Sequence, residues 1–288
     1  VSAQVNGVIR NVQSGEALDG ATVFINNSSW QSVSDEEGKF ILDGINPGFF
    51  ELIVYKNGYE IFQSTIRIQS GKEYRLNLSL IPRSKSKKIN VRQDDVWNGN
   101  FLRFKKAFLG SDRSDQYRIE NTQSLQFEVT GGGSLKAKSS IPLIVENKVL
   151  GYMMNVYQLH FESDLNKESQ IRAFINYQPI ESNDPDQQSK FEINRLKRYW
   201  GSYRHFFQSL ISNTTEEDGF LIGNSTNQSI QPSQLVSKGL VEGYYTIDLT
   251  DAIKVSYQEQ PGHVSFFLSD NIIEATYHRL RMCGSTSS

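Results

Sequence analysis

The feature that most limits the fold of this chain is the regular spacing of turn signals in its first third. Short runs of β-branched and aromatic residues alternate there with pairs of Gly, Asn and Asp. Residues 21–25 read Ala-Thr-Val-Phe-Ile and follow the turn pair Asp19-Gly20, and Asn57-Gly58 is a hairpin signal. About seven such runs at this spacing predict a small β-sandwich over residues 1–81.

Two aromatic residues are expected in the core of this sandwich. Phe40 and Tyr59 each follow a glycine turn and enter a strand, and Gly38 is expected to take a positive φ. Alternate residues of the last run are expected to share one face, and these are Tyr74, Leu76, Leu78 and Leu80.

Several short motifs before residue 60 occur in a characteristic order. They are Gly7-x-Val/Ile, Leu18-x-Gly20-Ala21-Thr22-Val23, Ser34-Asp35-x-x-Gly38-x-Phe40, Ile45-x-Pro47-Gly48 and Gly58-Tyr59. This order resembles the carboxypeptidase regulatory-like domain, a transthyretin-like (prealbumin-like) β-sandwich, over nearly all of residues 5–81. The resemblance implies an accessory role, as in the non-catalytic appendages of carboxypeptidases, outer-membrane receptors and other envelope proteins. It brings no catalytic residues with it.

The rest of the chain is expected to be a second, β-rich domain with inserted helices, so the predicted fold class is mainly β. Residues 82–92 form a basic, polar stretch that we interpret as the linker to a domain over residues 93–288. One helix is predicted near residues 95–109, with Asp94 or Asp95 as its cap and Gly110 at its end. Its apolar stripe is expected to contain Val96, Phe101, Phe104 and Phe108.

A second helical stretch is predicted near residues 190–212. Gly201 interrupts the pattern and Ser202 can cap a new segment, so a kinked pair of helices is expected. The apolar positions expected to form its buried stripe are Leu196, Tyr199, Trp200, Tyr203, Phe206, Phe207 and Leu210.

Motifs in this second part resemble the region that follows the domain in exported proteins of Bacteroidota-type bacteria. They are Phe101 to Gly110, Pro142-Leu143-Ile144-Val145-Glu146-Asn147, Leu150-Gly151-Tyr152 and Tyr199-x-Gly201-Ser202-x-x-His205-Phe206. Such proteins often carry a cysteine before the position of Arg118, where this chain has Tyr117. The departure argues against a redox or metal role at that position.

The N-terminal residues Val1-Ser2-Ala3-Gln4 read as the end of a signal peptide, with cleavage after Ala3, although an arbitrary chain boundary would look the same. We therefore expect an exported protein, in the periplasm or associated with the outer membrane. The net charge of −2 gives no long-range attraction to nucleic acid. No apolar run of about 18 residues is present, so no membrane-spanning helix of its own is expected.

The sequence lacks the common motifs of catalysis. It contains no His-Glu-x-x-His and no Gly-x-Ser-x-Gly, and the four histidines, His160, His205, His263 and His278, are not at helical metal-binding spacing. His205 is either a binding-site histidine or a packed helix residue, the latter being favoured. Cys283 is the only cysteine and has no evident base near it in sequence. We expect no enzyme activity, no cofactor and no metal.

Three acidic clusters remain as candidate carboxylate sites. They are Asp94-Asp95, Asp184-x-Asp186 and Glu216-Glu217-Asp218, all in contexts typical of turns or helix caps. Asp184 and Asp186 could bind calcium, but the twelve-residue calcium loop is missing.

Two functions are therefore weighed, with a carboxylate hydrolase as a remote third. The first is a non-catalytic accessory subunit of an envelope protein complex that binds protein partners, which are expected to be outer-membrane proteins. The second is a carbohydrate-binding module, suggested by aromatic richness, with Trp30 as the best surface ring and Trp97 and Trp200 expected in cores. The candidate protein-binding face lies on the paired helices and comprises Arg195, Arg198, Tyr203 and Arg204, with Lys197 beside them.

Overall fold

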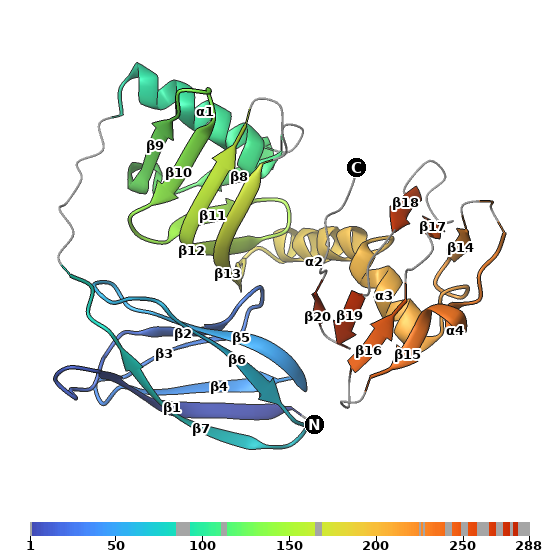
Figure 1. Ribbon diagram of the computed structural model, residues 1–288, viewed down its shortest axis with the longest axis horizontal. Helices are drawn as coiled ribbons and strands as arrows, with labels where there is room; N and C mark the ends of the chain where they lie inside the picture. Colours follow the sequence, from blue (N-terminus) through green and yellow to red (C-terminus); the bar gives the residue numbers. More distant parts are fainter. Residues whose placement is uncertain are drawn as a thin grey trace. The chain divides into compact units, whose positions relative to one another are not determined.

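The computed structural model describes residues 2–84, 93–110, 114–164, 169–224, 226, 228–239, 244–248, 253–257, 265–268, 273–276 and 279–281. The protein is mainly β, as predicted (Figure 1). Residues 85–92 of the predicted linker lie outside the described residues, as do His263, His278 and Cys283.

The chain divides into two compact units, which are described one at a time. Val1–Ile45, Phe50–Ile66 and Ser70–Glu192 form unit 1, and Asn46–Phe49, Arg67–Gln69 and Ile193–Ser288 form unit 2. Unit 1 thus holds most of the sandwich together with the following sheet. The domain boundary at residues 82–92 stays a prediction.

The sandwich consists of two sheets. The strands are β1 (Ala3–Asn11), β2 (Thr22–Ile25), β3 (Gln31–Val33), β4 (Lys39–Ile45), β5 (Gly48–Tyr55), β6 (Phe62–Ile68) and β7 (Glu73–Leu80). One sheet has the order β4-β1-β7, with β4 antiparallel and β7 parallel to β1, and the other has the order β3-β2-β5-β6. The predicted positive φ of Gly38 is confirmed at 75°.

The two aromatic predictions for the sandwich have different outcomes. Phe40 is buried, as predicted. Tyr59 is only half-buried, because it forms an isolated bridge with Pro82 beyond the last strand and its hydroxyl lies 3.4 Å from Asn11 Nδ2. In β7 the expected alternation is present, with Leu78 and Leu80 buried.

The second layer of unit 1 is an antiparallel sheet covered on one face by α1 (Asp95–Leu109). Its strands are β8 (Tyr117–Ile119), β9 (Leu125–Val129), β10 (Leu135–Ser139), β11 (Leu143–Asn147), β12 (Tyr152–Ser163) and β13 (Gln170–Pro179). The short 3-10 helices η1 (Ser114–Gln116) and η2 (Thr122–Ser124) precede β8 and β9. β12 is the central strand and pairs with β10, β11 and β13. Figure 1 shows α1 lying across the strands.

The predicted helix near residues 95–109 is confirmed, but its buried side differs from the prediction. Asp94 is the cap, with its carboxylate accepting from Trp97 N at 2.9 Å. Phe104 is buried as expected, whereas Val96 is exposed and Trp97 takes its place in the core. The Trp97 indole N–H donates to Leu125 O at 3.2 Å, so its polar atom is satisfied on the sheet side.

A loop of the sandwich is joined to the free edge of β13. Asn27 N donates to Ile175 O at 2.7 Å, and Tyr177 N donates to Ser28 O at 2.9 Å. Ile175 N in turn donates to the side chain of Asn26 at 2.8 Å. The sandwich and the sheet of unit 1 are therefore connected by backbone hydrogen bonds as well as by the chain.

Apolar packing supports the same junction. The ring of Tyr157 stacks on Phe24 with centroids 4.6 Å apart, and Ile53 completes the cluster. Burial raises the pKa of Tyr157 to about 12, so the phenol stays neutral at physiological pH. Phe24 and Ile53 point away from the sandwich interior, so the sheet that contains them is covered on both faces.

We expect Asn26→Ala to lower the free energy of unfolding of unit 1 by about 1–3 kcal/mol, because it removes a buried side chain and leaves the N–H of Ile175 without its partner at a partly buried position. Urea denaturation measures the loss. Gln63→Ala is the matched control, since Gln63 binds the same Glu51 carboxylate as Asn26 but on the surface. Equal, small effects for the two variants would contradict the importance of this contact.

Unit 2 is built from helices packed on short strands. Its helices are the second half of α2 (Pro185–Tyr199), α3 (Tyr203–Ser212) and α4 (Pro232–Leu235). Its strands are β14 (Phe220–Asn224), β15 (Val236–Lys238), β16 (Tyr244–Ile247), β17 (Ile253–Tyr257), β18 (Ser265–Leu268), β19 (Ile273–Thr276) and β20 (Arg279–Arg281). Two sheets result, with orders β14-β17-β18 and β15-β16-β19-β20. The core contains Phe206, Phe207 and Leu210 of α3 packed against the strands.

Candidate protein-binding site at the junction of α2 and α3

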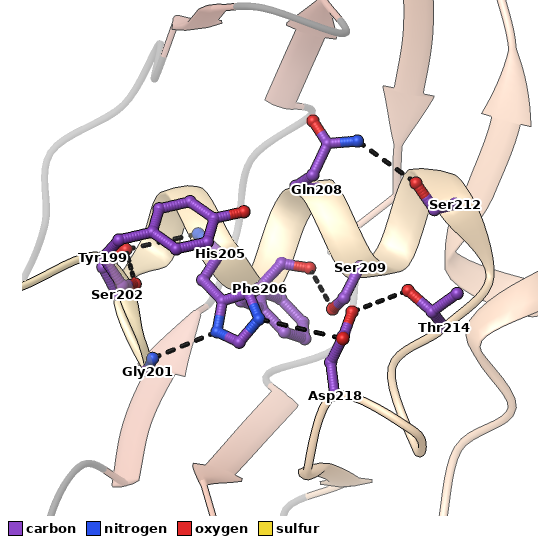
Figure 2. Close-up of polar contacts among 10 residues, drawn as sticks. All are labelled: Tyr199, Gly201, Ser202, His205, Phe206, Gln208, Ser209, Ser212, Thr214 and Asp218. Carbon is purple, nitrogen blue, oxygen red and sulfur yellow. Dashed lines mark hydrogen bonds and ion pairs between the residues drawn. The ribbon is translucent and has the colours of Figure 1, made fainter. Parts of the chain in front are cut away.

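The predicted kinked pair of helices is present, and the break is built by three residues between α2 and α3. Gly201 has a φ of 73°, a conformation that residues with a Cβ rarely adopt. Ser202 caps α3, with its hydroxyl accepting from His205 N at 3.2 Å and donating to Tyr199 O at 2.6 Å (Figure 2). The sequence therefore fixes both the end of α2 and the start of α3.

His205 lies beneath this break and is 2% exposed. Its Nδ1 accepts from Gly201 N at 3.1 Å, which leaves the proton on Nε2. Nε2 lies 4.0 Å from Asp218 Oδ1, and the other oxygen of Asp218 accepts from Thr214 Oγ1 at 2.6 Å (Figure 2). Both ring nitrogens face groups of the protein itself, so the structure supports the packed interpretation of His205.

Aromatic rings enclose the imidazole. The centroids of Tyr199, Trp200 and Phe220 lie 4.7–4.9 Å from that of His205. Burial raises the pKa of Tyr199, while the nearby Arg204 acts in the opposite direction. The rings and hydrogen bonds together hold the ends of the two helices in one arrangement.

The outer side of α2 carries an apolar stripe. Ile193, Leu196 and Trp200 occur at i, i+3 and i+7, which places them on one side of the helix. They are 49%, 54% and 45% exposed. The prediction that Leu196, Trp200 and the neighbouring Tyr203 are buried was wrong. The buried side chains of α3 fill the core of unit 2, and these three residues do not pack into it.

The four residues of the predicted protein-binding face do not share one side. At about 100° per residue, Arg195 and Arg198 lie roughly opposite Ile193 on α2. Arg198 is exposed and Arg195 is half-buried. Tyr203 and Arg204 are exposed in the first turn of α3. The structure thus offers two distinct surfaces, the apolar stripe and an arginine side, and sequence periodicity alone did not separate them.

The remaining sequence candidates have structural contacts. Asp94 caps α1, Asp184 accepts from Asp186 N at 3.0 Å at the start of α2, and Asp218 faces Thr214 and His205. Trp30 is half-buried, and its ring makes a T-shaped contact with that of Phe50 at a centroid distance of 5.6 Å. Within the described ranges, no group of three His, Cys, Asp or Glu residues is arranged to hold a metal ion, and no helix is long and apolar enough to cross a membrane.

Comparison with known proteins identifies the N-terminal part. A model of the CarboxypepD_reg-like domain matches residues 5–92. The N-terminal β-sandwich is therefore a CarboxypepD_reg-like domain, and the first resemblance drawn from the sequence is confirmed. The match extends beyond the predicted end of the sandwich at residue 81. Among curated proteins no match is found.

Several solved structures are similar to parts of the chain. They include a type II cohesin–X-dockerin complex from Acetivibrio cellulolyticus (18% identity, 27% of this chain and 56% of that chain, TM-score 0.24), the pilus 2b backbone protein of group B streptococcus (12%, 27% and 40%, TM-score 0.24) and catechol 1,2-dioxygenase from Acinetobacter sp. ADP1 (11%, 32% and 56%, TM-score 0.25). The chain spans only 40–56% of the length of these three structures. At such TM-scores, none of their activities or partners is assigned to this chain.

Proposed function

We propose that this protein is a non-catalytic accessory subunit of an exported, outer-membrane-associated complex, and that it binds a protein partner through the apolar stripe of α2. The observation that carries the proposal is the exposure of Ile193, Leu196 and Trp200 on one side of a helix. Large apolar side chains that gather on a surface mark interaction sites, and tryptophan is among the residues most enriched at the centres of interfaces.

The local structure favours binding because the stripe is preorganised. Trp200 sits at the end of α2, where the Ser202 cap and the His205 contacts fix the chain. The stripe therefore loses little conformational freedom when a partner docks on it, and preorganisation of this kind improves affinity. The exposed Arg198, on the other side of α2, would then remain in solvent or contribute to a polar rim.

A non-catalytic role is supported by the contacts of the candidate catalytic groups. Ser202, Asp94 and Asp184 are used as helix caps or in turns. Export and association with the outer membrane are supported by the resemblance of the second part of the chain to exported proteins. Fractionation of cells that express the complete natural protein tests the location, and a cytoplasmic protein would contradict it.

We expect Leu196→Asp to weaken the complex with the partner by about 2 kcal/mol or more, roughly 30-fold, because a buried interface cannot accommodate an unpaired carboxylate. The partner is identified by mass spectrometry after co-purification with the unmodified protein from native membranes, and its affinity for each variant is then measured with purified components.

The variant for comparison reverses two charges, Arg198→Glu with Arg204→Glu, at exposed positions of α2 and α3. If the arginine variant keeps the partner while Leu196→Asp loses it, the stripe is the contact. The reverse pattern places the contact on the arginine side and overturns the assignment to the stripe. Unchanged circular dichroism and urea midpoints exclude unfolding as the cause in either arm.

A further inference from the structure

The six-stranded sheet of unit 1, which consists of β8 to β13, is covered by α1 on one face. Part of its opposite face is hollowed. The hollow measures about 680 Å³ and is lined by residues of β9, β10, β12 and β13, with Trp97 of α1 at its margin beyond β9. That volume lies within the range of small-molecule sites, about 300–1,000 Å³. Its polar lining residues are Gln126, Glu128, Lys136, Lys138, His160, Glu162, Gln170 and Arg172, and the others are Trp97, Phe127, Ala137 and Phe161.

The register of the strands arranges the eight polar residues into two straight rows across the sheet. The first, called the cationic row, is Gln126, Lys138, His160 and Arg172, each paired directly with the next. The second, called the compensated row, is Glu128, Lys136, Glu162 and Gln170, likewise paired in sequence. The rows are two residues apart along each strand, about 7 Å.

A bulge in β12 brings His160 into the cationic row. The register shifts between Tyr157 and His160, and Gln158 has a φ of 51°. Because of the extra residue, Leu159 and Phe161 point into the core under α1. Tyr157 and His160 therefore lie on the same outer face, where the sandwich covers Tyr157 and leaves His160 exposed.

The two rows differ in how their charges are balanced. In the compensated row Lys136 stands between two carboxylates and pairs with Glu162 at 3.7 Å. In the cationic row Lys138 and Arg172 flank His160, and in the part of the chain that the structure describes neither forms an ion pair. Like charges on neighbouring strands are unfavourable, so this row favours an anionic group above it.

We propose that this hollow binds an acidic saccharide, with the sugar carboxylate on the cationic row and the hydroxyl groups on the compensated row. Lysine, arginine and histidine side chains donate to a carboxylate, and charge-assisted hydrogen bonds of this kind are the strong ones. Carboxylate, ammonium and amide groups alternate in the compensated row and offer both acceptors and donors to neutral hydroxyls. A ligand charged along its whole length would meet Glu128 and Glu162, so the ligand carries its charge at one end.

Calorimetric titration of the full chain tests the site with a disaccharide of one uronic acid and one neutral sugar, which carries a single carboxylate at one end, and with its neutral methyl ester. We expect the acid to bind at least tenfold more tightly than the ester and to weaken as salt is added. Lys138→Glu with Arg172→Glu is expected to remove binding of the acid by tenfold or more. Lys148→Glu with Lys190→Glu makes the same change in net charge at exposed positions outside the hollow and is expected to leave binding unchanged.

Three results overturn the proposal: equal affinity for the acid and the ester, no binding of the acid at millimolar concentration, or an equal loss in the control variant. Tighter binding of an acidic peptide or of anionic lipid vesicles than of the acid also overturns it, because the site would then serve another class of ligand. The milder pair Lys138→Gln with Arg172→Gln replaces the reversal if that variant does not fold, and is expected to give a smaller loss in the same direction.

Discussion

Phe206→Ala is expected to lower the free energy of unfolding of unit 2 by about 3–5 kcal/mol, the range typical of a buried phenylalanine. The side chain is fully buried in α3, with its ring 5.2 Å from Phe207 and 5.3 Å from Phe220. Removal of the ring leaves a cavity between α3 and β14, and Phe207 and Phe220 are each held on their own element and cannot move in to fill it. Urea denaturation, followed by circular dichroism and by tryptophan fluorescence, measures the loss.

Gln208→Ala is the control for this variant, because Gln208 is in the same helix but faces outward and contacts Ser212 at the surface (Figure 2). We expect it to change stability by less than about 0.5 kcal/mol. A loss below about 1 kcal/mol for Phe206→Ala would mean that α3 does not form the core of unit 2.

The second large effect is expected at the break between the helices. Gly201→Ala places a Cβ 2.9 Å from Tyr257 Cδ1 in a backbone conformation with a φ of 73°. The conformation costs about 1–2 kcal/mol for a residue with a Cβ, and displacing the tyrosine ring adds about 1–3 kcal/mol. We therefore expect a total loss of roughly 2–5 kcal/mol in urea denaturation, with weaker partner binding because Trp200 adjoins the break.

Gly99→Ala provides the contrast. Gly99 lies within α1 without a positive φ, and a Cβ there meets nothing within 4 Å. Alanine should stabilise that helix by about 0.5–1 kcal/mol. If the two substitutions change stability alike, the special backbone at residue 201 is not what determines the arrangement of α2 and α3.

The elements that the sequence predicts well are those with local signals. The sandwich follows from its turn pairs and ordered motifs, and the helix break follows from Gly201 and Ser202. Spacing alone is weaker evidence for burial. Leu196 and Trp200 recur as core residues would, but α2 packs little of its surface, so whether an apolar stripe is core or interface depends on which elements cover it.

The outer face of the sheet could not be predicted because it depends on register. Lys138, His160 and Arg172 are separated in sequence, and a bulge at Gln158 decides that His160 points outward. The sequence does contain a signal that one sandwich sheet is covered on both faces. Residues 23–25 are continuously apolar, as is typical of strands with both faces covered. The sequence did not indicate what provides the second cover.

The loop of residues 26–28 also has a consequence for solubility. A strand at the edge of a sheet presents unpaired N–H and C=O groups, which can recruit a strand from another molecule and begin aggregation. On β13 those groups at Ile175 and Tyr177 are already bonded to the loop. The loop of the N-terminal sandwich therefore blocks this part of the β13 edge, so that strands of other molecules cannot pair with it there.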